Sequence, residues 1–370
     1  MKNSDLPAFP VGERLMSLDF FRGFTMFLLI GESTLLYEHL RDPRLAGTIL
    51  QAIGSQLEHH PWAGLRFWDL VQPFFMFIVG VALAFSVARR DERGESRARI
   101  TRHIVVRSIV LLILGWALYC IGPGRITFQF QNVLAQLSVT YPIAYFLMRR
   151  RTGTQIAWSF VFIILTEVIY RIFWVAGYNQ PFAPGHNFGS WFDMLISGEV
   201  SPDHWVSFNA VPTAAHTIWG VLAGQVLRRA RPPSQKIRTL AFAGLTGVAS
   251  GFALTAVSPM IKRICTSSFV LASGGFCLLA LTLSYWTIDV RKLRRWTTFF
   301  NILGLDPIFI YLFTESGGTS WVTRLVRPFA EALFGRTGEL GAEIFVSLSA
   351  WAVLWLMCYW LYRKRIVIKI

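Results

Sequence analysis

This sequence contains few charged residues. Only 15% of its 370 residues are Asp, Glu, Lys or Arg, whereas 54% are hydrophobic. Soluble globular domains carry about 25% charged residues, so this composition excludes an ordinary soluble protein. The 14 Trp and 31 Phe residues support the same conclusion. We therefore predict an integral membrane protein.

Cysteines are also scarce, and several motifs are missing. The four cysteines lack the short paired spacing of a zinc site or a disulfide framework, and each falls in or beside an apolar segment. The sequence has no P-loop, no GxSxG turn and no HExxH zinc-protease motif. No internal repeat is evident, which disfavours a transporter built from inverted repeats. No metal site is predicted.

Acidic residues are outnumbered by basic ones, 21 to 36, which gives a formal net charge of +15. A basic excess can serve nucleic-acid binding, but no nucleic-acid-reading motif is present. The basic residues instead bracket apolar segments, as the positive-inside rule describes for membrane proteins. We predict the lipid bilayer, and no nucleic acid, as a partner.

Long apolar runs are abundant. A helix that crosses about 30 Å of hydrocarbon needs about 20 residues, so the sequence predicts an all-α polytopic bundle of about ten transmembrane helices in a single domain, residues 1–370. The expected spans are 16–38, 67–88, 104–121, 132–148, 155–176, 206–227, 239–258, 267–288, 297–315 and 341–362. The first carries charged residues and lacks the features of a cleaved signal peptide, so we expect it to be retained.

Most Lys and Arg residues fall on one side of this arrangement if the N-terminus is cytosolic. Both termini, including a tail at residues 1–13, are therefore predicted to be cytosolic. We also expect the protein to be a multi-pass protein of the inner membrane of the cell. The opposite side receives a long segment, residues 177–205. Segments of this length are usually functional or disordered. Trp191 and Trp205 suit a lid or acceptor-binding surface, and equally an aromatic belt at the membrane interface.

The stretch from His59 to Asp69 places titratable groups where a polar loop enters an apolar helix. An unpaired carboxylate at that depth costs several kcal/mol, so Asp69 must have a partner. A histidine oriented by a carboxylate can act as a general base. The alternative is that His59 and His60 are interfacial loop residues and that Asp69 is a satisfied packing group.

Further ionisable or polar residues lie within other expected spans. Asp19 and Arg22 can pair at positions i and i+3 of the first helix. His216 lies near the middle of the sixth span and Asn301 lies in the ninth. Together these residues predict a polar cavity inside the bundle, which could be a transport path or a catalytic channel.

Several motifs resemble those of the heparan-alpha-glucosaminide N-acetyltransferase family and its bacterial relatives. The two longest are residues 14–25 (RLMSLDFFRGFT) and residues 59–80, which begin HHPWAG and end DLVQPFFMFIVG. Supporting matches lie at 131–141, 211–213, 220–224 and 262–271. The matches cover most of the chain in the expected order, and the lack of a large extra-membranous N-terminal domain resembles the shorter bacterial form.

This resemblance implies a transmembrane acetyltransferase. Acetyl would pass from cytosolic acetyl-CoA to the amine of a glucosamine-type sugar on the other side of the membrane. The resemblance aligns the catalytic histidine with His59, with His60 as the alternative, and either direct transfer or an acetyl-histidine intermediate is compatible with it. Asp69 would orient the imidazole.

We assign the binding of acetyl-CoA, as a co-substrate, to a second group of residues. Arg22 and Lys262 would meet its anionic groups or the developing oxyanion, and Asp19 would hold Arg22 unless that pair is purely structural. His216 and Asn301 complete the predicted set. A homodimer is included among the predicted assemblies.

Residues 72, 261, 265 and 306 depart from the family pattern, so the acceptor could differ from that of the family. The alternative functions are a permease for N-acetylglucosamine or a similar amino sugar, which would use the same cavity, and an inactive structural relative. Sugar counterflow without acetyl-CoA would favour the permease.

Overall fold

The computed structural model describes residues 15–121 and 124–368, and over these residues the regular secondary structure is helical. An isolated bridge between Ala63 and Ile261 is the one extended pairing in these ranges. The all-α prediction is confirmed. The predicted tail at 1–13 lies outside the described residues. The described chain divides into two compact units, one within residues 55–282 and a second of residues 15–54 together with 283–368. The single domain stays a prediction.

Six helical segments in the described ranges are long and apolar enough to cross a membrane, which indicates a multi-pass membrane protein. They comprise Phe67–Glu92 (η2 and α4), Arg97–Ile121 (α5), Thr152–Ile172 (α7), Pro233–Ala256 (α10 and η4), Ser267–Val290 (α11 and η5) and Glu339–Lys364 (α15). A seventh would be the pair Thr297–Leu303 and Pro307–Thr337, which is bent by 65°.

The predicted count of about ten spans is not confirmed. Helices also occupy the remaining predicted positions, as α1 (Met16–Ser33), α6 (Val133–Leu147) and α9 (Ala210–Arg228). However, α1 carries three ionisable side chains and α6 has only 15 residues. Length and composition alone therefore do not identify these helices as spans.

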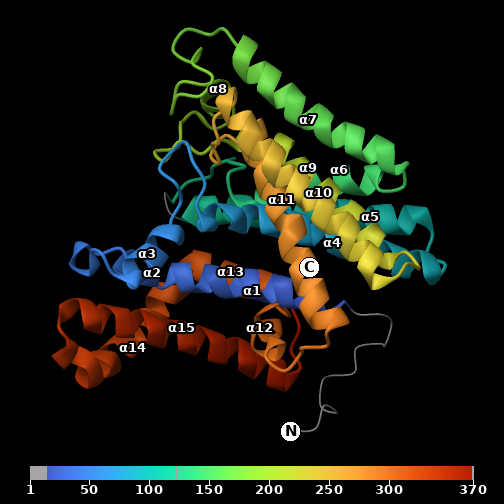
Figure 1. Ribbon diagram of the computed structural model, residues 1–370. Helices are drawn as coiled ribbons and strands as arrows, with labels where there is room; N and C mark the ends of the chain where they lie inside the picture. The colour runs from blue at the N-terminus through green and yellow to red at the C-terminus, as the bar shows by residue number, and fades with distance from the viewer. Residues whose placement is uncertain (1–14, 122–123, 369–370) are drawn as a thin grey trace. The chain divides into compact units, whose positions relative to one another are not determined.

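The unit that contains both ends of the described chain is built around α1, α12 (Thr297–Leu303) and α15. Gly23 lets α1 approach the backbone of α12 at Phe300, because a Cβ atom at this position would collide with the Phe300 carbonyl group. The Phe27 ring packs on Trp351 of α15 with the ring centroids 4.2 Å apart. Arg327 of α14 (Thr319–Phe334) pairs with Glu343 of α15, and these two helices lie beside each other (Figure 1).

The unit formed by residues 55–282 is organised around α4 (Val71–Glu92) and α9. Gly80 of α4 meets the Thr217 carbonyl, and Gly220 of α9 meets the Phe77 carbonyl. Small residues at such crossings let two helix backbones approach closely, which replaces the hydrophobic drive that lipid does not supply. Most of α4 is buried, whereas only a minority of the residues of α5 and α7 is buried. The latter two helices therefore cover the centre of this unit.

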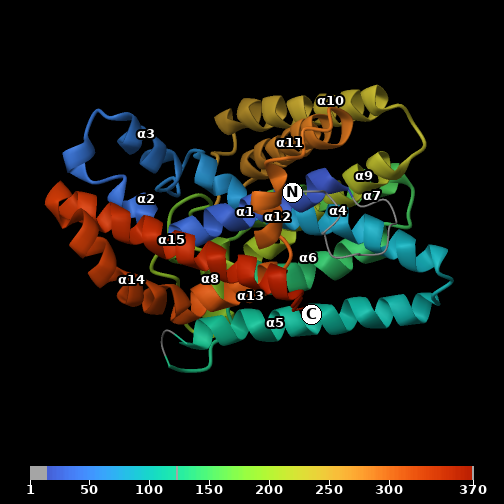
Figure 2. The same ribbon diagram turned by 90° about the horizontal axis from the view of Figure 1, so that it is seen from below.

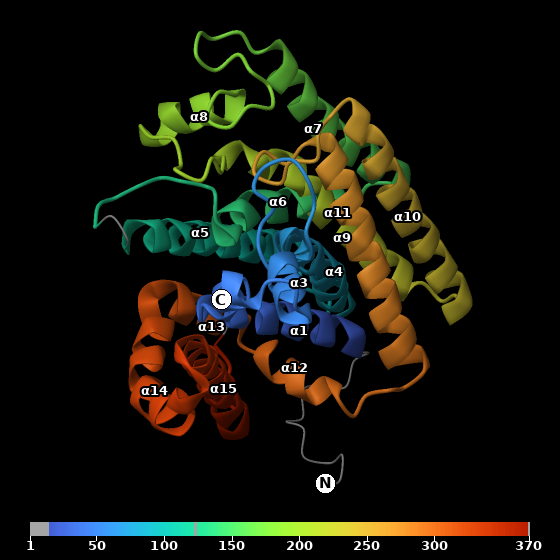
Figure 3. The same ribbon diagram turned by 60° about the vertical axis from the view of Figure 1, so that its left-hand side comes forward.

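Helices α10 (Pro233–Ala253) and α11 (Ser267–Ser284) pack against each other in the same unit (Figure 2). Gly244, Gly247 and Gly251 of α10 face Gly275 and Ala272 of α11, again a contact between small residues. The turn between η4 and α11 is joined to the loop that precedes η2 by the bridge between Ala63 and Ile261. Figure 3 shows α8 (Phe188–Ser197) within the long segment between α7 and α9.

Candidate active site

Asp69 is positioned by the start of its own helix. The 3₁₀ turn η2 (Phe67–Leu70) leads directly into α4, and the Arg66 backbone N–H donates to Asp69 Oδ2 at 2.9 Å. A carboxylate in the first helical turn accepts from free backbone N–H groups and interacts favourably with the helix dipole. The His60 backbone N–H also donates to Oδ2, at 3.3 Å. Asp69 is only 1% exposed, and the prediction that it has partners is confirmed.

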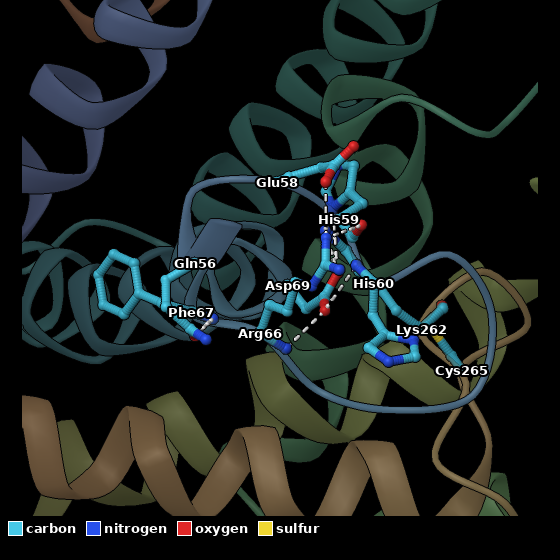
Figure 4. Close-up of polar contacts among 9 residues, drawn as sticks. All are labelled: Gln56, Glu58, His59, His60, Arg66, Phe67, Asp69, Lys262 and Cys265. Atoms are coloured by element: carbon cyan, nitrogen blue, oxygen red, sulfur yellow. Dashed lines mark hydrogen bonds and ion pairs between the residues drawn. The ribbon is translucent and has the colours of Figure 1, made fainter. Parts of the chain in front are cut away.

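The His59 imidazole is the side chain that the Asp69 carboxylate contacts from the preceding loop. His59 Nδ1 lies 3.0 Å from Asp69 Oδ1 (Figure 4). The His59 side chain is 31% exposed, and its Nε2 atom has no hydrogen-bond partner among the residues that the structure describes. One nitrogen is thus held by the carboxylate while the other is available to a substrate.

Lys262 reaches the same two residues from the turn before α11. Its Nζ atom lies 3.0 Å from His59 Nδ1 and 3.9 Å from Asp69 Oδ1. The turn is attached to the histidine loop, because the Gly64 N–H donates to the Met260 carbonyl at 2.7 Å and Ala63 bridges to Ile261. A site of three ionisable side chains therefore forms from two separate segments.

Trp205 encloses this cluster from the end of the long 177–205 segment. Its ring meets the His59 ring edge-on with centroids 5.1 Å apart, and Lys262 Nζ lies 5.3 Å from its centroid. The same segment contacts the loop again where Trp62 Nε1–H donates to the Phe182 carbonyl at 2.7 Å. The segment predicted as a lid or acceptor surface therefore lies against the histidine loop.

His60 occupies a different environment from its neighbour. Its ring packs against the Gly64 backbone, where a Cβ atom would collide with the imidazole. Its Nδ1 atom is buried without a hydrogen-bond partner in the described part of the chain. The contribution of His60 to the Asp69 carboxylate is its backbone N–H. The geometry therefore favours His59 over His60 as the residue that a carboxylate orients.

The surroundings of His59 disfavour its protonated form. Burial, and next the positive charge of Lys262, lower the pKa of His59 to about 4, although the hydrogen bond with Asp69 acts in the opposite direction. The imidazole is consequently neutral near pH 7. A neutral imidazole whose second nitrogen has no hydrogen-bond partner in the described chain can accept a proton, so the site has the properties of a general base.

The other residues that the sequence assigned to donor binding have partners of their own. His216 is fully buried, and its Nε2 atom lies 2.8 Å from Ser273 Oγ on α11. Asp19 and Arg22 form the expected i, i+3 pair at 3.0 Å, in the unit that does not contain His59. Asn301 is in that unit as well, with its Nδ2 atom 3.5 Å from Thr297 Oγ1. Their roles in donor binding stay predictions.

A chain of buried amides beside the site was not predicted. Gln72 donates to Gln136, which donates to Asn209 Oδ1 at 2.5 Å, and Asn209 Nδ2 donates to the Arg263 carbonyl at 3.4 Å. This chain links α4, α6 and the 3₁₀ turn η3 (Ser207–Asn209), which leads into α9, to the residue after Lys262. The signal in the sequence was a set of amide side chains within apolar helices, where each needs a hydrogen-bond partner.

Comparison with known proteins finds two relatives of the chain. No family model matches the chain. The chain is 26% identical to heparan-alpha-glucosaminide N-acetyltransferase of Homo sapiens in an alignment that covers 96% of the chain and 60% of the human protein. It is 25% identical to the protein of the same name from Mus musculus, over 85% of the chain and 56% of the mouse protein. The chain is a relative of heparan-alpha-glucosaminide N-acetyltransferase.

The relationship confirms the resemblance predicted from the motifs, and it extends over most of the chain. Conversely, the chain spans only 60% and 56% of the length of these two N-acetyltransferases. The names of the relatives describe an N-acetyl transfer to a glucosaminide, a reaction in which an amine loses a proton. The His59 cluster provides a group that can accept such a proton.

Proposed function

We propose that the protein is a transmembrane N-acetyltransferase that uses acetyl-CoA to acetylate the amine of a glucosamine-type sugar. The observation that carries this proposal is His59, whose Nδ1 contacts a buried carboxylate while its Nε2 has no partner in the described part of the chain. The relationship to two glucosaminide N-acetyltransferases supports the same reaction class. Acetyl-CoA would arrive from the cytosol, with both termini on that side of the inner membrane.

In this reaction the amine nitrogen attacks the thioester carbonyl carbon. A C–N bond forms, the C–S bond breaks, and the products are the N-acetyl sugar and CoA. His59 Nε2 takes the proton that the nitrogen loses and returns it to the CoA sulfur, so the enzyme ends in its starting state. Asp69 holds the ring by Nδ1 and stabilises the imidazolium that forms transiently. The alternative path acetylates His59 Nε2 first and then transfers the acetyl group.

The residues that would hold the donor are Arg22, with Asp19 as its support, and also His216 and Asn301. Fixed positive charge near a forming oxyanion stabilises it strongly where water is excluded. Lys262 was assigned to this group on the sequence, but its contact with His59 supports a role beside the base. We also propose about ten membrane spans. The presence of a helix at each predicted position supports this number.

The test uses purified protein in lipid nanodiscs, radiolabelled acetyl-CoA and a panel of amino sugars. His59→Gln should lower the transfer rate by about 10²- to 10⁴-fold, the usual contribution of a general base. His60→Gln is the matched control, because it keeps the backbone N–H that reaches Asp69 and should retain most activity. Normal transfer by a folded His59→Gln protein would refute the assignment. Sugar counterflow in vesicles without acetyl-CoA would instead identify a permease.

A further inference from the structure

We propose that Lys262 is a positioning residue that keeps His59 neutral and ready to accept a proton. This inference rests on the proposed function, since it concerns the same histidine. It goes further by explaining how the base is kept ready and how it releases the proton that it accepts.

Lys262 is fixed in its place by the turn that carries it. The Lys262 carbonyl accepts from the Cys265 backbone N–H at 2.9 Å, and the Ile261 N–H donates to Thr266 Oγ1 at 2.9 Å. The residue is 6% exposed, and its ammonium group lies over the Trp205 ring. An ammonium over an indole face gains electrostatic attraction from the ring. Both the backbone and the ammonium group of Lys262 are therefore held in place beside His59.

Asp69 and Lys262 compete for hydrogen bonding to the same atom, His59 Nδ1. An ionised Asp69 can only accept a hydrogen bond, and a Lys262 ammonium can only donate one. Both lie 3.0 Å from the same Nδ1 atom, which carries either a hydrogen or a lone pair. The two partners therefore require opposite tautomers of His59, and only one can be satisfied at Nδ1 at a time.

The tautomer with hydrogen on Nδ1 is the reactive one. Nδ1–H then donates to Asp69, and the Lys262 ammonium keeps an ion pair with the same carboxylate at 3.9 Å. The lone pair on Nε2 is left available to take a proton. Once Nε2 has accepted it, the imidazolium lies beside the ammonium, and like charges at this distance repel. Lys262 thereby favours return of the proton to the CoA sulfur.

The remaining charged groups around His59 do not replace Lys262 in this role. Arg263 on the same turn also acts against protonation but ranks as a smaller influence than Lys262, and Asp69 acts in favour of it. Arg66 Nη1 lies 3.3 Å from the His59 carbonyl and 2.6 Å from Glu58 Oε2, so its charge is paired. Of the two positive charges that act against protonation of His59, Lys262 should therefore have the larger effect when it is removed.

The experiment measures carbethoxylation of His59 by diethylpyrocarbonate, which attacks neutral imidazole, between pH 4 and 8 by peptide mass spectrometry. In the wild-type protein we expect a midpoint well below the ordinary histidine value of about 6.5. Lys262→Met should raise this midpoint by one unit or more, so that modification at pH 4 slows by about fivefold or more. Lys262→Arg, which keeps the charge, should stay near the wild type.

Lys236→Met is the matched control, because it removes the same charge from a lysine whose Nζ binds the Leu227 carbonyl on the other side of the α9–α10 turn. It should leave the midpoint unchanged. Lys262→Gln supplies a second neutral variant if Lys262→Met does not fold. A wild-type midpoint at 6.5 or above, or the same midpoint in a folded neutral variant, overturns the proposal. This assay needs no acetyl transfer, so its result is separate from that of the transferase test.

Discussion

Asp69 and Asp193 are two carboxylates of one unit that are buried to the same degree but held by different partners. Asp69 is 1% exposed and lies against the His59 imidazole and the Lys262 ammonium. Asp193, on α8, is 0% exposed and accepts from the Ser207 backbone N–H at 3.0 Å and from Gln131 Nε2 at 3.1 Å. Its partners in the described chain are neutral.

The difference shows what a charged partner adds to hydrogen bonding. Burial raises the pKa of Asp193 to about 6, and its hydrogen bonds from Ser207 and Gln131 only oppose that rise. Asp69 also accepts backbone hydrogen bonds but has a cation at ion-pair distance, which stabilises its negative charge. Asp69 is thus the carboxylate placed for the role proposed beside His59, whereas Asp193 holds the turn that leads from Trp205 into α9.

The largest difference between the two carboxylates should appear when each is changed to an amide. Asp69→Asn should lower turnover by about 10²-fold or more, because the amide can neither stabilise a transient imidazolium nor balance Lys262. The affinity for acetyl-CoA should fall much less, which steady-state kinetics with varied donor will separate. Asp193→Asn makes the same chemical change and should keep turnover within a few-fold. Equal losses of turnover and donor affinity, or aggregation, would favour a packing role for Asp69.

The second test of this comparison is how the stability of the Asp193→Asn protein depends on pH. A folded-state pKa of about 6 lies above the ordinary value of 3.8, so the stability that protonation contributes is present below pH 4 and is lost as the pH rises through 6. The loss is up to about 3 kcal/mol for two units. The neutral variant avoids this loss. Thermal unfolding in detergent should find the variant more stable at pH 7.5 and equal to wild type at pH 4. Parallel pH curves would contradict this interpretation.

Trp205→Leu tests whether the aromatic cover supports the charged partner of Asp69. Loss of the ring over Lys262 should cost about 0.5–2 kcal/mol, a few-fold to about 30-fold in kcat/KM. Trp174→Leu is the control, because Trp174 is 83% exposed and follows the C-cap residue of α7. Its kcat/KM should match wild type. Equal effects of the two substitutions would show that Trp205 acts only as general apolar surface.

Arg66→Gln should have the smallest effect. The Arg66 backbone N–H that reaches Asp69 is kept, and the lost ion pair with Glu58 is partly solvent-exposed. Such pairs contribute less than about 1 kcal/mol. Turnover and melting temperature should both stay close to wild type. A loss as large as that of Asp69→Asn would mean that the side chain, and not the backbone, organises the carboxylate.

The sequence predicted the helical class, the need of Asp69 for a partner, and the i, i+3 pair of Asp19 and Arg22. Each of these predictions depends on local spacing or on the energy of burying a charge. None of them requires knowledge of distant contacts. The number of spans was harder to predict, because α1 carries ionisable residues and α6 is short. Apolar length alone does not separate such helices from buried ones.

The site was only partly predictable for a related reason. His59 and His60 are adjacent and chemically identical, so spacing could not choose between them. Lys262 was assigned to donor binding because no local pattern connects it with a histidine 203 residues earlier. The amide chain through Gln136 and Asn209 likewise joins helices that are far apart in the sequence.

The sequence by itself determined that the chain is helical and enters a membrane, because run length and composition must match the bilayer. It also determined that a carboxylate at residue 69 could not stand alone. Only the tertiary structure decided that His59 and not His60 turns its ring to that carboxylate, and that Lys262 completes the cluster. These two features depend on how the Gly64 backbone packs against the turn before α11. The two segments are far apart in the sequence, so no local pattern predicts that they meet.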